Sequence, residues 1–182
     1  MKLEIWSDFT CPYCYIGKKY FEAALEQFKY KDTVEVIYRS FELDPYAKKN
    51  TNESVLENLS KKYGISLERA MDMTESVTIQ ASEVGLHYDF SKIKAVNTFD
   101  AHRLSHYAKS QGKMADMNER LLKAHFMEGL DISHYETLVN LAVEIGLKEE
   151  EAEEVLSSAS FSNEVVADEE KAKGLDIDGV PY

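Results

Sequence analysis

Residues 7–19 read SDFTCPYCYIGKK and contain both cysteines of the 182-residue chain. Cys11 and Cys14 are separated by Pro12 and Tyr13. A C-x-x-C pair can be half of a zinc site, a redox pair, or two buried thiols that happen to be close. Pro12 fits the first turn of a helix, where a missing N–H costs nothing. We therefore place Cys11 at the cap of a helix that follows a strand.

This placement makes the two thiols unequal. The sulfur of Cys11 faces the free N–H groups of the first helical turn, including that of Cys14, and their dipoles favour a thiolate. Cys14 lies one turn further into the helix and is expected to be better shielded. The pattern predicts that Cys11 attacks a substrate disulfide and that Cys14 resolves the mixed disulfide.

The segments around the pair predict a β-α-β unit. Residues 2–9 alternate apolar and polar side chains, residues 11–30 have apolar side chains at helical spacing, and residues 33–43 are β-branched and alternating. Such a unit prefers parallel strands and a right-handed crossover.

From about residue 51 to residue 159 the pattern is helical throughout, with glycines as stops, and residues 162–174 form a further amphipathic helix. Asn52, Ser66 and Ser162 are the predicted N-caps of three of these helices. We predict three segments: a first α/β part (1–46), a helical insertion (47–160) and a second α/β part (161–182).

Composition narrows the classes of function. The net charge is −12, which disfavours nucleic acid and anionic membrane surfaces as partners. No run of about 18 apolar residues and no signal peptide are visible, so the expected location is the cytoplasm. In that compartment a C-x-x-C is more often catalytic or metal-binding than a structural disulfide.

Zinc binding would need two ligands besides the cysteines. His102 and His106 have i, i+4 spacing and can share a helix face. A binding or scaffold protein that holds a metal through these four residues is therefore an alternative, although the sequence does not connect the two pairs. The leading expectation is that there is no metal.

Five segments carry a resemblance to a known family. They are DFTCPYCYIG (8–17), FELDP (41–45), NTFDAHRL (97–104), KAHFMEGLDI (123–132) and GVP (179–181). In this order they resemble the DsbA-like branch of the thioredoxin superfamily, in particular its FrnE-like subgroup. The resemblance implies an α/β thioredoxin-like fold with an inserted all-helical domain, and a thiol–disulfide oxidoreductase.

The same resemblance implies roles for the last residues. Pro181 would be the cis-proline opposite the thiols, and the backbone of Val180 would bind an extended substrate segment beside Cys11. Without the resemblance, Pro181 would be a plain turn proline. Family members continue after this proline with two strands and a helix, so we expect those C-terminal elements to be missing from this chain.

Four further residues are candidates for substrate contact. Tyr13 lies between the cysteines and can cover the site or receive a peptide side chain. His102 either faces the cleft above Cys11 or packs between helices. Asn97 either reaches the cleft or caps a helix, and Phe9 either contacts substrate or packs in the core.

A second class of function is a glutathione-dependent isomerase or transferase, like the chromene-carboxylate isomerases and kappa-class transferases. These usually have a serine at the position of Cys11, so the intact pair argues against them. The leading hypothesis needs no cofactor beyond the Cys11–Cys14 disulfide, with glutathione as a candidate co-substrate. Its expected partners are protein or small-molecule disulfides.

Overall fold

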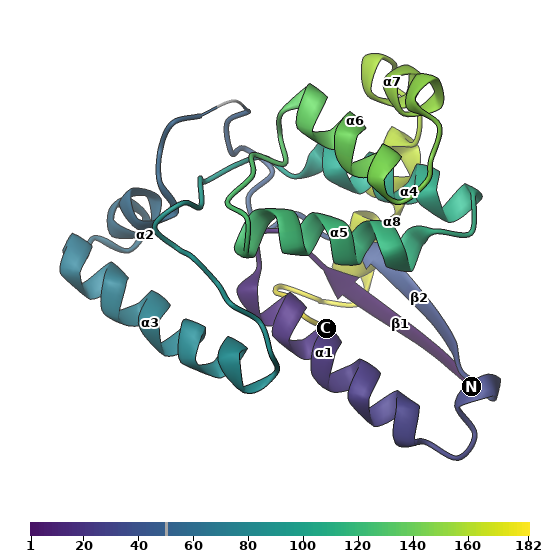
Figure 1. The fold of residues 1–182 in the computed structure, drawn as a ribbon, viewed down its shortest axis with the longest axis horizontal. Coiled ribbons are helices and arrows are strands. Elements are labelled where there is room, and N and C mark those ends of the chain that lie inside the picture. Colours follow the sequence, from purple (N-terminus) through teal and green to yellow (C-terminus); the bar gives the residue numbers. More distant parts are fainter. Residues whose placement is uncertain (50) are drawn as a thin grey trace.

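The computed structural model describes residues 1–49 and 51–182 (Figure 1). Two strands and eight α-helices follow one another in the order that the sequence pattern predicts. They are β1 (Lys2–Ser7), α1 (Pro12–Gln27), the 3-10 turn η1 (Lys31–Thr33), β2 (Glu35–Ser40), α2 (Val55–Tyr63), α3 (Leu67–Glu83), α4 (Phe99–Ser110), α5 (Met114–Phe126), α6 (Tyr135–Glu144), α7 (Glu149–Ser157) and α8 (Ser162–Gly174).

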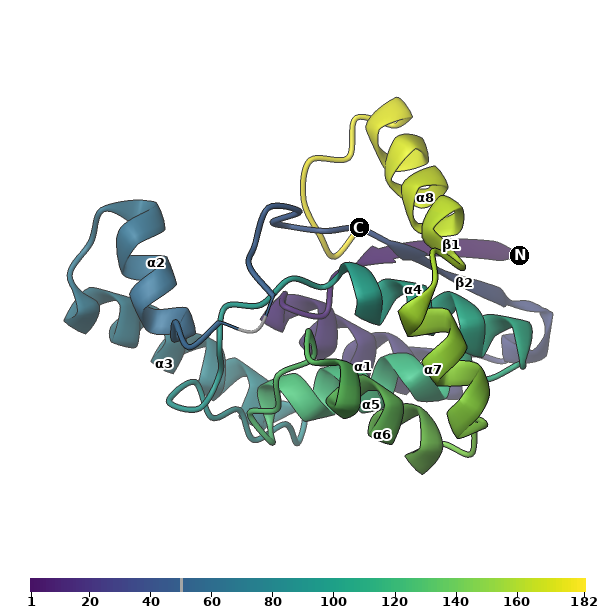
Figure 2. The ribbon, with the colours of Figure 1, turned by 90° about the horizontal axis from the view of Figure 1, so that it is seen from above.

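The sheet is built from β1 and β2, which pair in parallel from Lys2↔Glu35 to Ser7↔Ser40. Helix α1 connects the two strands and lies on one face of the sheet, while α8 lies on the other (Figure 2). The chain returns to the free side of β1 at Tyr182, which exchanges two backbone hydrogen bonds of 3.1 and 3.2 Å with Trp6. The predicted α/β fold with helices inserted after the second strand is confirmed.

Two clusters of buried side chains form the core. The larger one joins α1 to the inserted helices, and it includes Tyr15, Leu104 and Leu121. The smaller one, which includes Trp6 and Ala172, fills the space between the sheet and α8. The core thus runs across the predicted boundary at residue 46, because α1 packs directly against the inserted helices.

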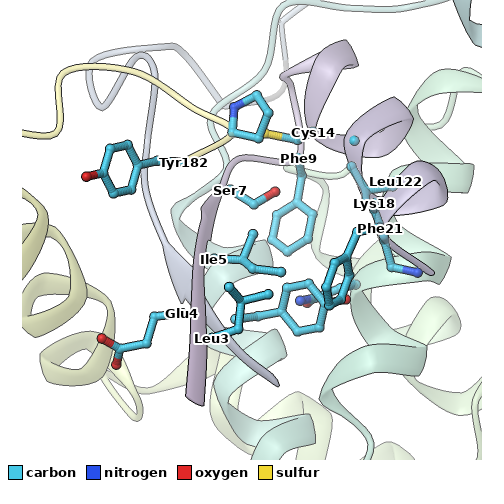
Figure 3. A pocket seen from close by; sticks show the side chains of 14 residues that line it. Leu3, Glu4, Ile5, Ser7, Phe9, Cys14, Lys18, Phe21, Leu122 and Tyr182 are labelled. Carbon is cyan, nitrogen blue, oxygen red and sulfur yellow. The ribbon is translucent and has the colours of Figure 1, made fainter. Parts of the chain in front are cut away.

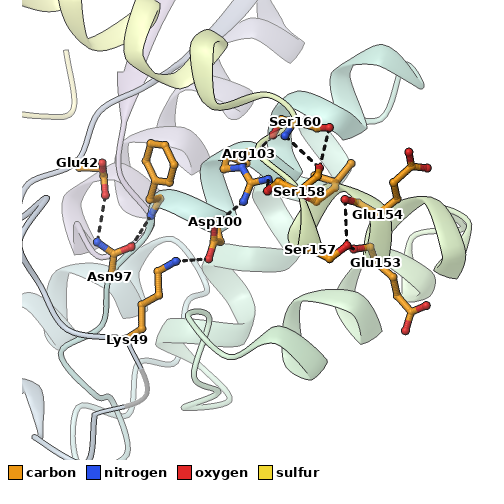
Figure 4. Close-up of polar contacts among 12 residues, drawn as sticks. Glu42, Lys49, Asn97, Asp100, Arg103, Glu153, Glu154, Ser157, Ser158 and Ser160 are labelled. Carbon is orange, nitrogen blue, oxygen red and sulfur yellow. Dashed lines mark hydrogen bonds and ion pairs between the residues drawn. The ribbon is translucent and has the colours of Figure 1, made fainter.

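A buried arginine ties the middle of the chain to its C-terminal part (Figure 4). Arg103 of α4 donates hydrogen bonds to the carbonyl oxygens of Ser160 (2.9 Å), Ser158 (2.5 Å) and Val155. It also pairs with Asp100 at 2.8 Å. These bonds satisfy carbonyls at the end of α7 and fix where α8 begins.

Two predicted helix caps are wrong. Helix α2 is capped by Ser54, two residues after Asn52, through a reciprocal pair of hydrogen bonds with Glu57. Helix α8 has Phe161 at its N-cap, with φ +62°, and Ser162 is its first residue. The predicted cap of α3 is confirmed, because Ser66 accepts a hydrogen bond from the N–H of Arg69.

The described residues include no helix that has both the length and the apolar character needed to cross a bilayer.

Candidate active site

Cys11 occupies the N-cap of α1, as predicted, and Pro12 is the first helical residue. The backbone of Cys11 is extended, with φ −89° and ψ 111°. Its N–H donates to the carbonyl oxygen of Asp8 at 3.3 Å, and its own carbonyl accepts from the N–H of Cys14 at 3.1 Å. This tight turn between β1 and α1 places the sulfur of Cys11 beside the backbone N–H groups of Tyr13 and Cys14.

The two thiols are free and differ in acidity. A hydrogen bond from Cys14, together with the N–H groups of Cys14 and Tyr13, lowers the pKa of Cys11 despite its burial and the negative charge of Asp8. Burial and the hydrogen bond to Cys11 raise the pKa of Cys14. The thiolate is therefore favoured on Cys11, the thiol at the helix cap.

The expected difference in shielding is not seen, because Cys11 and Cys14 each keep an exposed fraction of 4%. The asymmetry of the pair is thus one of hydrogen bonding and position. Each cysteine lines a different cavity, so the two sulfurs are approached from different sides.

The Val180–Pro181 peptide bond is cis, as the resemblance implied. The Sγ of Cys11 donates a hydrogen bond to the carbonyl oxygen of Val180 at 3.3 Å. Because Tyr182 pairs with Trp6, this segment is fixed beside the end of β1. The carbonyl of Val180 is thus held beside the thiol of Cys11, and its substrate-binding role stays a prediction.

A cavity of about 590 Å³ lies against Cys11. Pro12, Tyr13 and Val180 line it beside Cys11, and the side chain of Tyr13 keeps an exposed fraction of 46%. Its opposite wall comes from α2 and α3. A volume of this size is typical of sites for small ligands or for part of a larger one, which lie at roughly 300–1,000 Å³.

A smaller cavity of about 270 Å³ lies behind Cys14, between β1 and α1 (Figure 3). Leu3 and Ile5 of β1 and Phe21 of α1 give it apolar walls, and Pro181 lines it too. It therefore offers an apolar surrounding to Cys14, consistent with the raised pKa of that thiol.

His102 lies behind the turn that holds Cys11. Its Nε2 donates to Oδ1 of Asp8 at 3.3 Å, and both side chains are buried. The other carboxylate oxygen of Asp8 accepts from the N–H of Leu43 at 2.8 Å and from the hydroxyl of Thr10 at 3.0 Å. Burial opposes the charge on Asp8, yet His102, the N–H of Leu43 and the side chain of Thr98 hold the pKa of Asp8 below its usual value.

Asn97 is buried at the start of α4 and stays close to the chain segment after β2 (Figure 4). Its Nδ2 donates to Glu42 and to the carbonyl of Pro45, both at 3.4 Å, and its Oδ1 accepts from the N–H of Phe99 at 3.1 Å. Burial, helped by the charges of Glu169 and Asp8, raises the pKa of Glu42 to about 7.

Phe9 is buried and packs against His102, with ring centroids 4.6 Å apart. Among the described residues that line the 590 Å³ cavity, we find neither Phe9 nor His102 nor Asn97. The structure thus brings together Cys11, Cys14, Pro12, Tyr13, Val180 and Pro181. Phe9 lines the smaller cavity beside Cys14, while His102 and Asn97 lie in the surrounding framework.

Sequence reasoning missed three residues near the thiols. Asp8 anchors the turn, Tyr88 donates its hydroxyl hydrogen to the carbonyl of Pro12 at 2.8 Å, and His125 lines the larger cavity. A signal existed for two of them: Asp8 lies three residues before Cys11, and His125 is a polar residue within the apolar face of its helix. Nothing local in the sequence connects Tyr88 to Pro12.

The zinc alternative requires the four thiol and imidazole groups to converge. Within residues 1–49 and 51–182 no group of three or more Cys, His, Asp and Glu side chains could hold a metal ion. His106 instead contacts Ser40 and Asp168, at 3.1 and 3.2 Å.

The chain is similar to known proteins in sequence and in structure. The chain matches the family described as DSBA-like thioredoxin domain over residues 2–182. A probable DsbA oxidoreductase from Streptomyces coelicolor is 42% identical, with a TM-score of 0.95, over 100% of this chain and 78% of that one.

Two further matches are more distant. The uncharacterized protein YwbO of Bacillus subtilis (strain 168) is 32% identical over 80% of this chain, which spans 66% of the length of YwbO. The structure of a 2-hydroxychromene-2-carboxylate isomerase is similar over 100% of this chain and 83% of that one, with a TM-score of 0.72 and 16% identity. At that identity the likeness concerns the fold alone.

Proposed function

The chain belongs to the DSBA-like thioredoxin domain family, and we propose that it is a thiol–disulfide oxidoreductase acting through Cys11 and Cys14. The observation that carries the proposal is the position of Cys11. It lies at a helix N-cap, with a lowered pKa, next to Cys14 and on the wall of a 590 Å³ cavity. A thiolate in such a place is a nucleophile that a disulfide can reach.

The reaction follows from the unequal thiols. The Cys11 thiolate attacks one sulfur of a substrate disulfide, the substrate S–S bond breaks, and the departing thiolate takes up a proton. Cys14 then loses its proton and attacks Sγ of Cys11, which releases the second substrate thiol and forms the Cys11–Cys14 disulfide. The substrate gains two electrons and the protein loses two, and the reverse sequence oxidises a dithiol.

The surrounding residues support each step. The N–H groups of Tyr13 and Cys14 stabilise the thiolate on Cys11, and the carbonyl of Val180 accepts the hydrogen of the Cys11 thiol. Buried Asp8 and His102 hold the turn on which Cys11 sits. In this role His102 and Asn97 would act through the framework, and Tyr13, Val180 and Pro181 would contact substrate.

The proposal needs no bound cofactor, because the thiol pair carries the electrons, and glutathione stays a predicted co-substrate. Protein or small-molecule disulfides are the proposed partners. The FrnE-like subgroup and the cytoplasm stay predictions from the sequence. Whether the protein oxidises or reduces depends on its potential, which in related folds ranges from roughly −270 to −120 mV.

Variants of the two cysteines test the mechanism. We expect Cys11→Ser to reduce disulfide exchange to the uncatalysed rate, because the nucleophile is gone. We expect Cys14→Ser to accumulate mixed disulfides on Cys11, because they can no longer be resolved. Mass spectrometry of the intact chain, after incubation with a peptide disulfide and acid quenching, reads both results, and the double variant supplies the background.

The wild-type protein is then equilibrated in graded glutathione buffers and alkylated, which gives the potential of the pair. Full exchange activity in Cys11→Ser, or no reversible disulfide between Cys11 and Cys14, would rule out the mechanism. A glutathione-dependent activity on an organic electrophile that survives Cys14→Ser would instead favour the isomerase or transferase class.

A further inference from the structure

The cavity beside Cys11 has a mainly apolar wall opposite the thiol. Helices α2 and α3 and the segment after them supply this wall. Its large apolar side chains are Leu59, Tyr63, Met73, Val77, Phe90 and Ile93. Three charged residues, Lys62, Lys94 and Asp44, also line the cavity. An apolar group attached to a disulfide would leave water on entering this space.

His125 is the unusual polar residue of this cavity. It comes from α5 and its exposed fraction is 2%. No hydrogen-bond partner of its ring nitrogens is found among the residues that the structure describes, and these nitrogens are not among the fully enclosed unpaired atoms of those residues, so they are open to the cavity. Its ring packs edge-on against Phe126, with centroids 4.8 Å apart. Burial lowers the pKa of His125 to about 4, so the imidazole is neutral near pH 7 and keeps one N–H donor.

The other two buried histidines differ. His102 bonds to Asp8 and His106 bonds to Ser40 and Asp168, so each has a partner within the fold. The imidazole of His125 instead faces the cavity, where a bound molecule can form a hydrogen bond with it. A ligand in the cavity would supply the partner that His125 lacks.

Building on the proposed function, we infer that His125 is a substrate-binding residue, whose imidazole donates a hydrogen bond to a carbonyl or carboxylate beside the disulfide that Cys11 attacks. The apolar wall then receives a hydrophobic group on the same side of that disulfide. Two sources share this chemistry: a protein cysteine next to a hydrophobic residue, and a small organic disulfide.

Chromogenic mixed disulfides test the inference. Ac-Phe-Cys-NH2 and Ac-Glu-Cys-NH2 are each joined through the cysteine sulfur to 5-thio-2-nitrobenzoate. The Cys11 thiolate attacks the cysteine sulfur of the probe, the bond to the aromatic sulfur breaks, and the coloured thiolate leaves. The departing group is the same in both probes, so single-turnover rates at several concentrations compare the peptide parts.

We expect the Phe probe to need a lower half-saturating concentration than the Glu probe. His125→Leu should raise this concentration for the Phe probe about threefold to tenfold, which corresponds to the loss of one hydrogen bond. The limiting rate should change less. His125→Gln, which keeps an N–H donor, should recover part of the loss. His134→Leu is the matched control, because His134 is exposed at the start of α6.

The unfolding temperature shows whether each variant keeps its fold. The rate of Cys11 alkylation by iodoacetamide shows whether the thiol keeps its reactivity. A hexapeptide probe with the same Phe-Cys centre separates the two sources. A lower half-saturating concentration than that of the dipeptide assigns the cavity to protein disulfides, and an equal one assigns it to small molecules; both agree with the inference.

Three outcomes would overturn it. If coloured thiolate is released at the same rate from wild type and Cys11→Ser, the proposed function fails and the inference fails with it. If release requires Cys11 but His125→Leu behaves like His134→Leu, only the inference is overturned. A wild-type preference for the Glu probe has the same meaning and needs no variant of His125.

Discussion

The helices behind the thiols are packed differently from those across the cavity from Cys11. On one side, α4 buries every residue from 101 to 108 and α5 contributes Met117 and Leu121, both fully buried. On the other side, α2 has no buried residue, and α3 buries only Ala70, Thr74, Val77 and Ala81. Figures 1 and 2 show α2 and α3 together at one end of the molecule, beyond α1. We refer to α2 and α3 as the arm.

This difference in packing suits two roles: holding the reacting groups in place and adapting to substrate. The side that carries Cys11, Cys14 and Asp8 is fixed by the core, as reacting groups require. The arm has few buried contacts, and such regions open locally at low free-energy cost. It carries several exposed apolar side chains, among them Tyr63, Met71 and Ile79. We therefore expect the arm to adapt to substrate while the thiols keep their geometry.

The largest test of this contrast compares one substitution in the core behind the thiols with one substitution in the arm. Leu121→Ala should lower the free energy of unfolding by about 2–5 kcal/mol, because it leaves a cavity in the core. Leu59→Ala, in half-buried surroundings on α2, should lower it by less than about 1 kcal/mol. Urea denaturation followed by circular dichroism measures both. Equal losses would show that the arm is as firmly packed as the core.

A smaller expected effect is the pH dependence of stability caused by Glu42, which lies outside the arm. Its pKa is raised to about 7 by burial and by the nearby charges of Glu169 and Asp8. The folded protein therefore binds this proton more tightly than the unfolded chain. The resulting stabilisation is complete below about pH 4.5, the ordinary value, and is lost as pH rises through about 7.

Glu42→Gln should remove this dependence. Because the side chain is partly exposed, we expect the difference in unfolding free energy between variant and wild type to shift by about 1–2 kcal/mol in favour of the variant between pH 4.5 and pH 8. Urea denaturation at several pH values checks it, with exposed Glu26→Gln as the control. A difference that does not vary with pH would contradict the assignment.

The smallest effect is confined to the arm. Ser54→Ala removes the side chain that accepts the N–H of Glu57 at 3.2 Å. A lost cap costs about 1 kcal/mol, so amide exchange within α2 should become about fivefold faster while α4 is unaffected. Ser157→Ala, at the far end of α7, is the matched control. Faster exchange in α4 as well would mean that the arm and α4 open together.

Much of the fold could be predicted because the signals are local. Alternating strands, a helix that begins at Pro12 and glycine stops such as Gly64, with φ +63°, are properties of short segments. Phe161 was missed as an N-cap because it adopts φ +62°, which is rare for a bulky residue, while its ring lies 6.1 Å from that of Tyr107. That contact is tertiary and has no counterpart in the local sequence.

The site residues also fall into two groups: those whose positions could be predicted, and those whose positions depend on tertiary contacts. The cap position of Cys11 follows from Pro12, and the cis bond before Pro181 followed from resemblance. The directions of His102 and Asn97 did not follow, because helical spacing does not say which neighbour a face meets. Asp8 and Glu42 are their partners, from segments 94 and 55 residues away along the chain.

The hydrogen bond between Cys11 and Val180 joins residues 169 positions apart. During synthesis at about 5–20 residues per second, roughly 10–30 seconds pass between the addition of the first and of the second. Contacts so distant in sequence also form late in folding, since closing the loop between them costs entropy. During synthesis the Cys11 thiol therefore exists for many seconds without its carbonyl neighbour, exposed to oxidants and chaperones.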